Sequence, residues 1–262
     1  MPAAAPLRGT GVLVTRPEQQ ADGLCRLFQS RGASVYRLPA MSIVEHPQRR
    51  QRLAAQRDQP DPDLVIFTSA NAVRFGEPVL AQRRDLVLAA IGPATARALN
   101  QAGYRIGVLP AAGFDSEALL AMPRFANLSG QQVLLVKGEG GRELLERELQ
   151  ARGATVRTLA VYARRPATPS RQNLEQIEQA FDAGQIHLIT ATSLELARYL
   201  LELAPSGLRR HLERTAWITP GTRVNESLAA AGIRGPLLAA DSAENQDLLA
   251  AALRWRSSAS GT

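Results

Sequence analysis

The sequence predicts an α/β fold in which one structural unit is used twice, and three observations predict it. Short apolar runs alternate with amphipathic, helix-like segments along the 262-residue chain, which is the pattern of parallel α/β units. Runs such as residues 86–88 and 133–136 are continuously apolar, as expected of strands that helices cover on both faces. Segments of the first half also recur, in the same order, in the second half, and such self-similarity indicates a repeated unit.

The repeat opens with a strand, a helix and a second strand, predicted over residues 12–36 and again over 133–162. Both first strands are apolar runs that end in a cation. Both helices end in an Arg-Gly-Ala step, whose glycine suits the left-handed conformation found at many helix ends. The second strands are expected to run through Tyr36 and Tyr162.

Three further matches follow along the chain: residues 64–69 with 188–193, 91–95 with 218–222 and, more weakly, 115–117 with 241–244. Each matched pair marks a strand end or a helix start. Four matches in a compatible order do not arise easily by chance.

The repeat alone leaves the division into domains open. A tandem arrangement would split the chain near residue 128. Crossings at the proline-containing segments 38–40 and 164–166 would instead insert one lobe into the other. Both segments follow an extended stretch, which is the conformation that the residue before proline prefers.

The chain carries a formal net charge of +7, almost wholly from arginine, with Lys137 as its single lysine. A basic balance can indicate nucleic acid, an anionic membrane or an acidic small molecule as partner. The arginines are scattered and aromatic residues make up only 5% of the chain, so we expect no nucleic-acid partner. The densest cluster, residues 49–57, is expected to be a solvated helix face.

The sequence also predicts a cytoplasmic protein that does not enter a membrane. No apolar run approaches the roughly 18–20 residues of a membrane span, and residues 1–11 lack a signal-peptide pattern. Cys25 is the single cysteine, which excludes an internal disulfide and a zinc site built from cysteines. Its apolar-periodic surroundings predict a buried thiol.

Small, hydroxylic or cationic residues stand where the predicted strands give way to helices. Ligands of open parallel sheets bind at the carboxyl ends of the strands, and helix starts favour anions. A cleft with such a lining suits a polyanion. The alternative is plain helix capping, since Thr15 with Glu18 and Thr192 with Glu195 have capping-box spacing.

Conventional catalytic motifs do not occur in the sequence. His46, His187 and His211 are far apart, and His187 lies at a strand start, the wrong end for a site. Residues 138–141 have the spacing of neither a P-loop nor a dinucleotide-binding turn. We expect no metal and no cofactor, so an enzyme with this sequence would act by binding and shaping a reactive substrate.

Several segments match a known family: residues 14–17, 38–39, 66–73, 91–96 and 161–162. Phe-Thr-Ser-x-x-Ala-Val at 67–73 and Ile-Gly-x-x-Thr-Ala at 91–96 are its most specific pieces. On these motifs the chain resembles the uroporphyrinogen-III synthase family over about residues 9–254.

The resemblance implies two Rossmann-like or flavodoxin-like parallel-sheet lobes, joined by a two-stranded linker, with the active site in the cleft between them. It favours the inserted arrangement, with residues 1–38 and 167–262 in lobe 1 and residues 42–162 in lobe 2.

It also implies a lyase that cyclises hydroxymethylbilane, a linear tetrapyrrole with eight carboxylates, to uroporphyrinogen III. Water is lost and ring D is inverted, as a step of heme or siroheme biosynthesis, without a cofactor or metal. Tyr162 occupies the position of the family's tyrosine and is expected to assist departure of the hydroxyl. The expected substrate-binding residues lie at the strand ends: Arg16, Thr68, Ser69, Asn71, Gly92, Thr95, Lys137, Gly138, Ser193 and Thr222.

Two alternatives stay open at this point. Tyr162 could merely pack between the lobes, and the chain could be a non-catalytic two-lobed binding protein for an acidic metabolite. We expect a monomer that makes at most transient contact with the preceding enzyme of the pathway.

Overall fold

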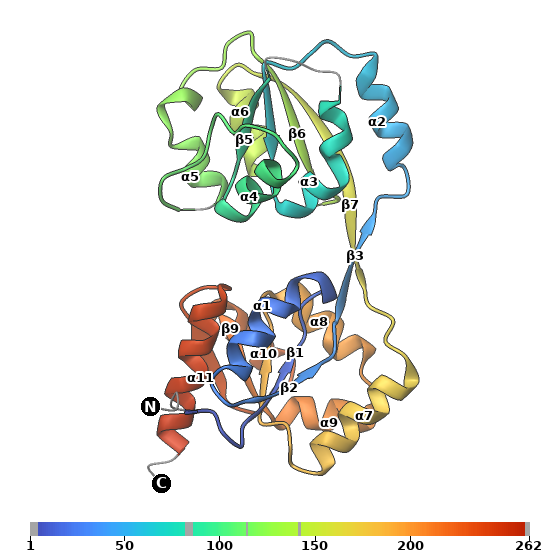
Figure 1. The fold of residues 1–262 in the computed structure, drawn as a ribbon, viewed down its shortest axis with the longest axis vertical. Helices are drawn as coiled ribbons and strands as arrows, with labels where there is room; N and C mark the ends of the chain where they lie inside the picture. The colour runs from blue at the N-terminus through green and yellow to red at the C-terminus, as the bar shows by residue number, and fades with distance from the viewer. Residues whose placement is uncertain (1–4, 82–85, 114, 141–142, 260–262) are drawn as a thin grey trace. The chain divides into compact units, whose positions relative to one another are not determined.

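The computed structural model describes residues 5–81, 86–113, 115–140 and 143–259. The chain divides into two compact units (Figure 1). Unit 1 comprises Met1–Ser42 and Arg165–Thr262, and unit 2 comprises Ile43–Arg164.

Unit 1 is built on a five-stranded sheet in the order β10-β9-β8-β1-β2, in which all neighbours are parallel. Counted along the chain, this is the strand order 2-1-3-4-5 of flavodoxin-like folds. The strands are β1 (Gly11–Val14), β2 (Ser34–Arg37), β8 (Leu188–Thr190), β9 (Ala216–Pro220) and β10 (Leu237–Ala240). The helices are α1 (Glu18–Gln29), α7 (Arg171–Asp182), α8 (Leu194–Leu203), α9 (Ser206–Arg214), α10 (Thr222–Ala230) and α11 (Asn245–Ala259).

Unit 2 has a second five-stranded sheet, in the order β3-β7-β6-β4-β5. Its strands are β3 (Met41–Glu45), β4 (Leu64–Phe67), β5 (Val87–Ala90), β6 (Gln132–Gly138) and β7 (Thr155–Pro166). Its helices are α2 (Arg49–Arg57), α3 (Ala70–Gly76), α4 (Pro93–Gln101), α5 (Ser116–Leu120) and α6 (Leu144–Ala151), with the short 3₁₀ turns Glu77–Leu80 and Pro123–Phe125.

The repeat seen in the sequence is reproduced in the two sheets. The strands β7, β6, β4 and β5 lie in the same order as β2, β1, β8 and β9, which are the segments that the sequence matches pair together. An isolated parallel bridge from Ala89 to Val108 extends the second sheet beyond β5. The predicted α/β fold with two sheets is therefore confirmed, and both sheets are mostly parallel.

The strand β4 shows why the central strands are continuously apolar. Val65 and Phe67 pack with α3 and α4 on one face of the sheet. Leu64 and Ile66 pack with α5 and α6 on the other. Successive side chains of a strand point to opposite faces, so a strand covered twice needs an apolar residue at every position.

Two neighbouring strands carry the chain from one unit to the other. The boundary of the units falls within β3 at residues 42–43 and within β7 at residues 164–165. Backbone hydrogen bonds from Ala167 to Ala40 (3.0 Å) and from His46 to Val161 (3.1 Å) lie on either side of these crossings.

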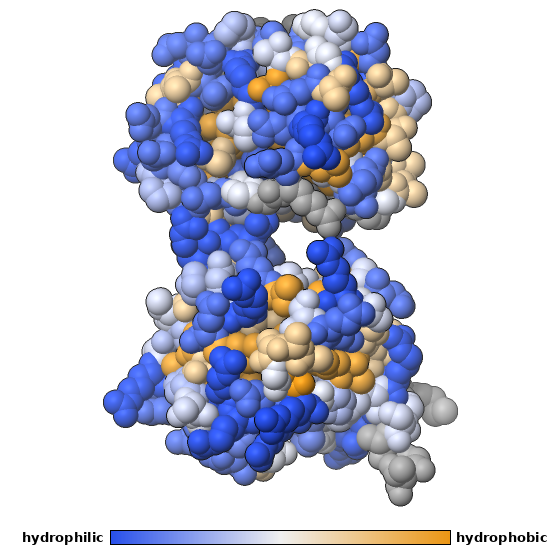
Figure 2. All heavy atoms as spheres, turned by 180° about the vertical axis from the view of Figure 1, so that it is seen from behind, coloured by the Kyte–Doolittle hydropathy of each residue, from blue (hydrophilic) through white to orange (hydrophobic). Residues whose placement is uncertain are grey.

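Figure 2 shows a band of apolar side chains across one face of the unit that holds both termini, with hydrophilic residues around it. Among the described residues, the large hydrophobic side chains classed as exposed are Val44 and Leu109, each at 38%, and both belong to unit 2. The band on unit 1 is therefore made of partly covered side chains.

Gly11 offers a test of how tightly the first sheet is closed. A Cβ atom at Gly11 would lie 1.7 Å from the carbonyl oxygen of Gln185, so β1 or the segment before β8 would have to move. We expect Gly11→Ala to lower the free energy of unfolding by about 2–3 kcal/mol, measured by denaturant unfolding. Ser34→Ala, at the residue paired with Gly11, is exposed and should change it by less than about 0.5 kcal/mol. Equal stabilities would contradict this account.

Candidate active site

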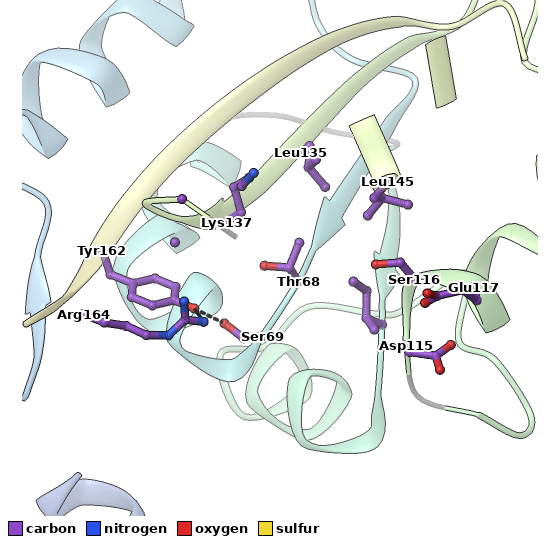
Figure 3. Close-up of a pocket in the computed structure, with 13 residues that line it drawn as sticks. Thr68, Ser69, Asp115, Ser116, Glu117, Leu135, Lys137, Leu145, Tyr162 and Arg164 are labelled. Atoms are coloured by element: carbon purple, nitrogen blue, oxygen red, sulfur yellow. Dashed lines mark hydrogen bonds between the residues drawn. The ribbon is translucent and has the colours of Figure 1, made fainter. Parts of the chain in front are cut away.

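A pocket of about 260 Å³ lies at the carboxyl ends of β4 and β6 (Figure 3), and all the residues that line it belong to unit 2. The helices after these two neighbouring strands leave toward opposite faces of the sheet, because α3 packs on one face and α6 on the other. A crevice at such a switch point is where open α/β sheets bind ligands.

An irregularity in strand pairing places Tyr162 in this pocket. Lys137 of β6 pairs with Ala160 of β7, whereas the next residue, Gly138, pairs with Tyr162. Val161 is therefore an extra residue, a bulge that breaks the alternation of the strand. As a result, Val161 and Tyr162 are consecutive yet belong to the same apolar cluster.

The ring of Tyr162 is held from two sides and is only 2% exposed. Phe75 stacks on it with a centroid separation of 6.1 Å and an interplanar angle of 28°. Gly138 lies beneath it, and a Cβ atom there would come within 2.6 Å of Cζ of Tyr162. Gly138 is thus required for space, which gives this predicted site residue a definite structural role.

The hydroxyl group of Tyr162 has two polar neighbours. The Oγ atom of Ser69 is 3.1 Å away, and the Nη2 atom of Arg164 is 3.5 Å away. Ser69 also caps α3, because its Oγ accepts a hydrogen bond from the backbone N–H of Ala72 at 3.0 Å. Figure 3 shows Ser69, Tyr162 and Arg164 together at one side of the pocket.

The two predicted cations are in different situations. Lys137 lines the pocket, and we find no hydrogen bond or ion pair of its side chain within the described ranges. Arg16 lies in unit 1, where its guanidinium donates to Oδ1 of Asn245 at 2.6 Å and to the carbonyl of Ala243. Burial lowers the pKa of Arg16 from its ordinary value. Arg16 is therefore engaged in fixing the start of α11.

Of the other predicted site residues, Thr68 lines the pocket beside Ser69. Asn71 follows in the first turn of α3 and Gly92 is the N-cap of α4, both outside the pocket lining. Thr95 is 4% exposed in the first turn of α4. The pocket thus brings together Thr68, Ser69, Lys137, Gly138 and Tyr162.

Ser193 and Thr222 belong to unit 1. Ser193 is the N-cap of α8 and accepts from the backbone N–H of Leu196 at 3.1 Å, which is the bond that Ser69 makes in unit 2. Thr222 is exposed and is the first residue of α10, after an N-cap, Gly221, with a φ of 80°.

Both capping-box predictions are wrong in detail. The N-cap of α1 is Pro17, and Thr15 instead donates to the carbonyl oxygen of Thr190 at 2.6 Å within the sheet. The N-cap of α8 is Ser193, one residue after the predicted Thr192. Box spacing identified the helix starts to within one or two residues, but for Thr15 a contact within the sheet takes the place of capping.

Other polar residues of the pocket were not predicted as site residues from the sequence. Arg164 could have been found from its position two residues after Tyr162, since such residues share a strand face. Asp115 and Glu117 line the opposite side (Figure 3), and Asp115 caps α5 through the backbone N–H of Ala118 at 2.8 Å. The pocket therefore carries cations at one side and carboxylates at the other.

The three histidines take part in local structure. Nδ1 of His187 accepts from the backbone N–H of Gly11 at 3.0 Å, and Nδ1 of His46 accepts from that of Gln48 at 3.1 Å. His211 lies 2.9 Å from Asp182 and stacks on Phe181.

Within the described part of the chain, no three His, Cys, Asp or Glu side chains gather as metal ligands would. None of the helices described there combines the length and apolar character needed to cross a bilayer.

Comparison with known proteins gives a consistent result. The family model described as "Uroporphyrinogen-III synthase HemD" matches residues 22–250. The chain is 31% identical over 252 residues to the uroporphyrinogen-III synthase of Salmonella typhimurium, covering 92% of this chain and 98% of the relative. It is 30% identical over 210 residues to that of Escherichia coli, covering 76% and 82%.

Solved structures share the fold. A uroporphyrinogen-III synthetase from Helicobacter pylori superposes with a TM-score of 0.59 at 14% identity, covering 94% of this chain and 99% of that one. A mutant uroporphyrinogen III synthase from Thermus thermophilus gives a TM-score of 0.57 at 20% identity, covering 97% and 100%.

Comparison of Ser69 with Ser193, which caps the equivalent helix of unit 1, tests whether Ser69 does more than cap a helix. We expect Ser69→Ala and Ser193→Ala each to lower the free energy of unfolding by about 1 kcal/mol, because each removes one N-cap bond. Ser69→Ala alone should also disturb the pocket, since Ser69 alone of the two touches Tyr162. Denaturant unfolding measures the first effect, and a crystal structure of each variant would show whether the Tyr162 ring has moved. A loss of stability at one position only would contradict the equivalence of the caps.

Proposed function

Because the chain belongs to the uroporphyrinogen-III synthase family, we propose that it converts hydroxymethylbilane to uroporphyrinogen III, with loss of water and inversion of ring D. The observation that supports this function best is the placement of the Tyr162 hydroxyl. It lies in a pocket at a switch point that Lys137 also lines, and among the described residues the side chain of Lys137 has no hydrogen-bond or ion-pair partner.

The proposed reaction begins with departure of the terminal hydroxyl group, which leaves an azafulvene cation. Ring D then attacks through its substituted carbon to form a spiro intermediate, and reopening followed by reclosure inverts the ring. Tyr162 donates a hydrogen bond to the departing hydroxyl, which stabilises the negative charge that develops on its oxygen. The bilane that remains after the hydroxyl group leaves carries the positive charge, as the azafulvene cation.

The size of the pocket limits what it holds. Its volume of about 260 Å³ is slightly below the range of roughly 300–1,000 Å³ that is usual for ligand sites. It therefore suits one end of a linear tetrapyrrole and not all four rings. Leu135 and Leu145 provide apolar wall for a pyrrole ring, and Lys137 provides a cation for one of its carboxylates.

Selectivity is the main task of such an enzyme, because cyclisation without inversion occurs readily in these bilanes. Holding the reacting ends in one geometry is the physical means of favouring one product. The ring of Tyr162 is fixed by Phe75 and Gly138, so its hydroxyl group can hold the departing end of the substrate in one geometry. Asn71, Gly92, Thr95, Ser193, Thr222 and Arg16 stay predicted substrate contacts.

We further propose a cytoplasmic monomer that receives its substrate by transient contact with the preceding enzyme. A reactive substrate supports the second part of this proposal, because direct transfer shortens its time in water. Sedimentation of the purified protein would give its mass.

Product analysis tests the function directly. Freshly prepared hydroxymethylbilane incubated with the protein should give the type III isomer in excess over the type I isomer of the spontaneous reaction. Chromatography of the oxidised products measures the ratio. Type I product alone, with or without saturable binding of the bilane, would identify a binding protein and refute the proposal.

Tyr162→Phe tests the tyrosine. We expect kcat to fall about 10- to 100-fold, because a hydrogen bond to the leaving group is lost. Tyr36→Phe is the control, since it removes the hydroxyl of a half-buried tyrosine outside the pocket lining, which donates to Gln185 at 3.0 Å. Thermal unfolding of both variants separates activity from stability. An unchanged kcat in Tyr162→Phe would leave the tyrosine as a packing residue.

Lys137→Met tests the carboxylate receptor. Loss of one charge-assisted hydrogen bond corresponds to an increase in KM of about tenfold or more, with a smaller effect on kcat. Arg171→Met removes one positive charge from an exposed residue of α7 that pairs with Glu175, and it should leave KM unchanged. Steady-state kinetics at low salt compares the two, and equal effects would point to net charge as the cause.

A further inference from the structure

Packing fixes the ring of Tyr162 but leaves the direction of its hydroxyl proton open. The C–O bond of a phenol can be rotated to point the proton toward either polar neighbour or into the pocket. Only the last direction lets Tyr162 donate to a ligand. Whatever sets this choice therefore decides whether the tyrosine can take part in the reaction.

Arg164 is the neighbour that donates without being able to accept. Its Nη2 atom is 3.5 Å from the hydroxyl oxygen of Tyr162, and its Cζ atom lies 5.8 Å from the centroid of the ring. The first distance is at the long end for a hydrogen bond, as is common for catalytic contacts before a ligand binds. A guanidinium there makes the phenol oxygen an acceptor on that side and repels its proton.

Ser69 completes the arrangement. Its Oγ atom already accepts the backbone N–H of Ala72, and its own proton is free to point at the oxygen of Tyr162, 3.1 Å away. With Arg164 and Ser69 both donating, the two lone pairs of the phenol oxygen are occupied. The Tyr162 proton then has the pocket as its remaining direction.

From this geometry we propose that Arg164 is a positioning residue: together with Ser69, it directs the hydroxyl proton of Tyr162 into the pocket. The proposal rests on the function proposed above and adds a residue to its mechanism. When the carbon–oxygen bond of the substrate breaks, the electron pair leaves with the hydroxyl group, which accepts the hydrogen bond of Tyr162. The positive charge of Arg164 stabilises the electron density that this donation places on the phenol oxygen.

The position of Arg164 in the strand supports this role. It follows Tyr162 by two residues on β7, beyond the last pair with β6, so both side chains extend from the same face. The intervening Ala163 is fully buried. Arg164 and Lys137 both line the pocket, but within the described part of the chain Arg164 is the one of the two that contacts the tyrosine.

The alternative role for Arg164 is that of a second carboxylate receptor. The two roles differ in their kinetic effects. A receptor contributes to binding in the ground state and the transition state alike, so its loss raises KM. A residue that acts through Tyr162 contributes mainly in the transition state, so its loss lowers kcat.

A double-mutant cycle distinguishes them. Arg164→Met, Tyr162→Phe and the double variant are assayed for formation of the type III isomer from hydroxymethylbilane. We expect Arg164→Met to lower kcat about tenfold with less than about threefold change in KM, and to have no further effect on kcat once Tyr162 is Phe. Arg164→Lys, which keeps a cationic donor, should recover part of the loss.

Arg165→Met is the matched control, because Arg165 is the next residue of the same strand, is exposed and does not line the pocket. It should retain the wild-type kcat and KM. Circular dichroism and thermal unfolding check that each variant is folded. If Arg164→Met fails to fold, Arg164→Gln replaces it in the same cycle, because its neutral amide removes the charge and keeps a polar side chain.

Three results would overturn the inference: equal losses of kcat in the wild-type and Tyr162→Phe backgrounds, an increase confined to KM, or no change at all. Each of them is compatible with a wild-type protein that makes the type III isomer, so the proposed function would survive. Type I product alone from the wild-type protein would overturn both.

Discussion

The site depends on one constraint of parallel sheets, namely that a helix must leave each strand toward one face or the other. In unit 2 the helix after β4 packs on one face and the helix after β6 on the opposite face. No helix then covers the gap between the two strand ends, and polar side chains there remain accessible. The pocket and the access to its cation, Lys137, are consequences of this arrangement.

The fold class was predictable from the sequence because it follows from local patterns. Continuous apolar strands, helix-ending glycines and matched turns each depend on a few neighbouring residues. The repeat gave the equivalence of β6, β7 and β4 with β1, β2 and β8, which the sheet orders confirm. Thr68, Ser69, Lys137 and Gly138 were predicted as strand-end residues, and strand ends of one sheet share an edge. Tyr162 was predicted from the family resemblance.

The contacts that distinguish the two units were not predictable, because they join residues far apart in the chain. Arg16 and Lys137 are equivalent in the repeat, yet Arg16 is engaged by Asn245, 229 residues away. Tyr36 and Tyr162 looked equivalent as well. By register, Tyr36 pairs with Leu13, whose counterpart Leu134 pairs with Arg157. Tyr162 therefore has no equivalent residue in the repeat of unit 1. The bulge at Val161 is what pairs it with Gly138.

The presence of one lysine only, Lys137, has a practical consequence for chemical labelling. It is the single lysine of the chain, and it lines the pocket. An amine-selective reagent used on the folded protein can therefore modify one side-chain amine, and that amine reports on the pocket. Protection from the reagent would register occupancy by any bound molecule, without turnover, without a chromophore in the ligand and without changing a residue of the protein.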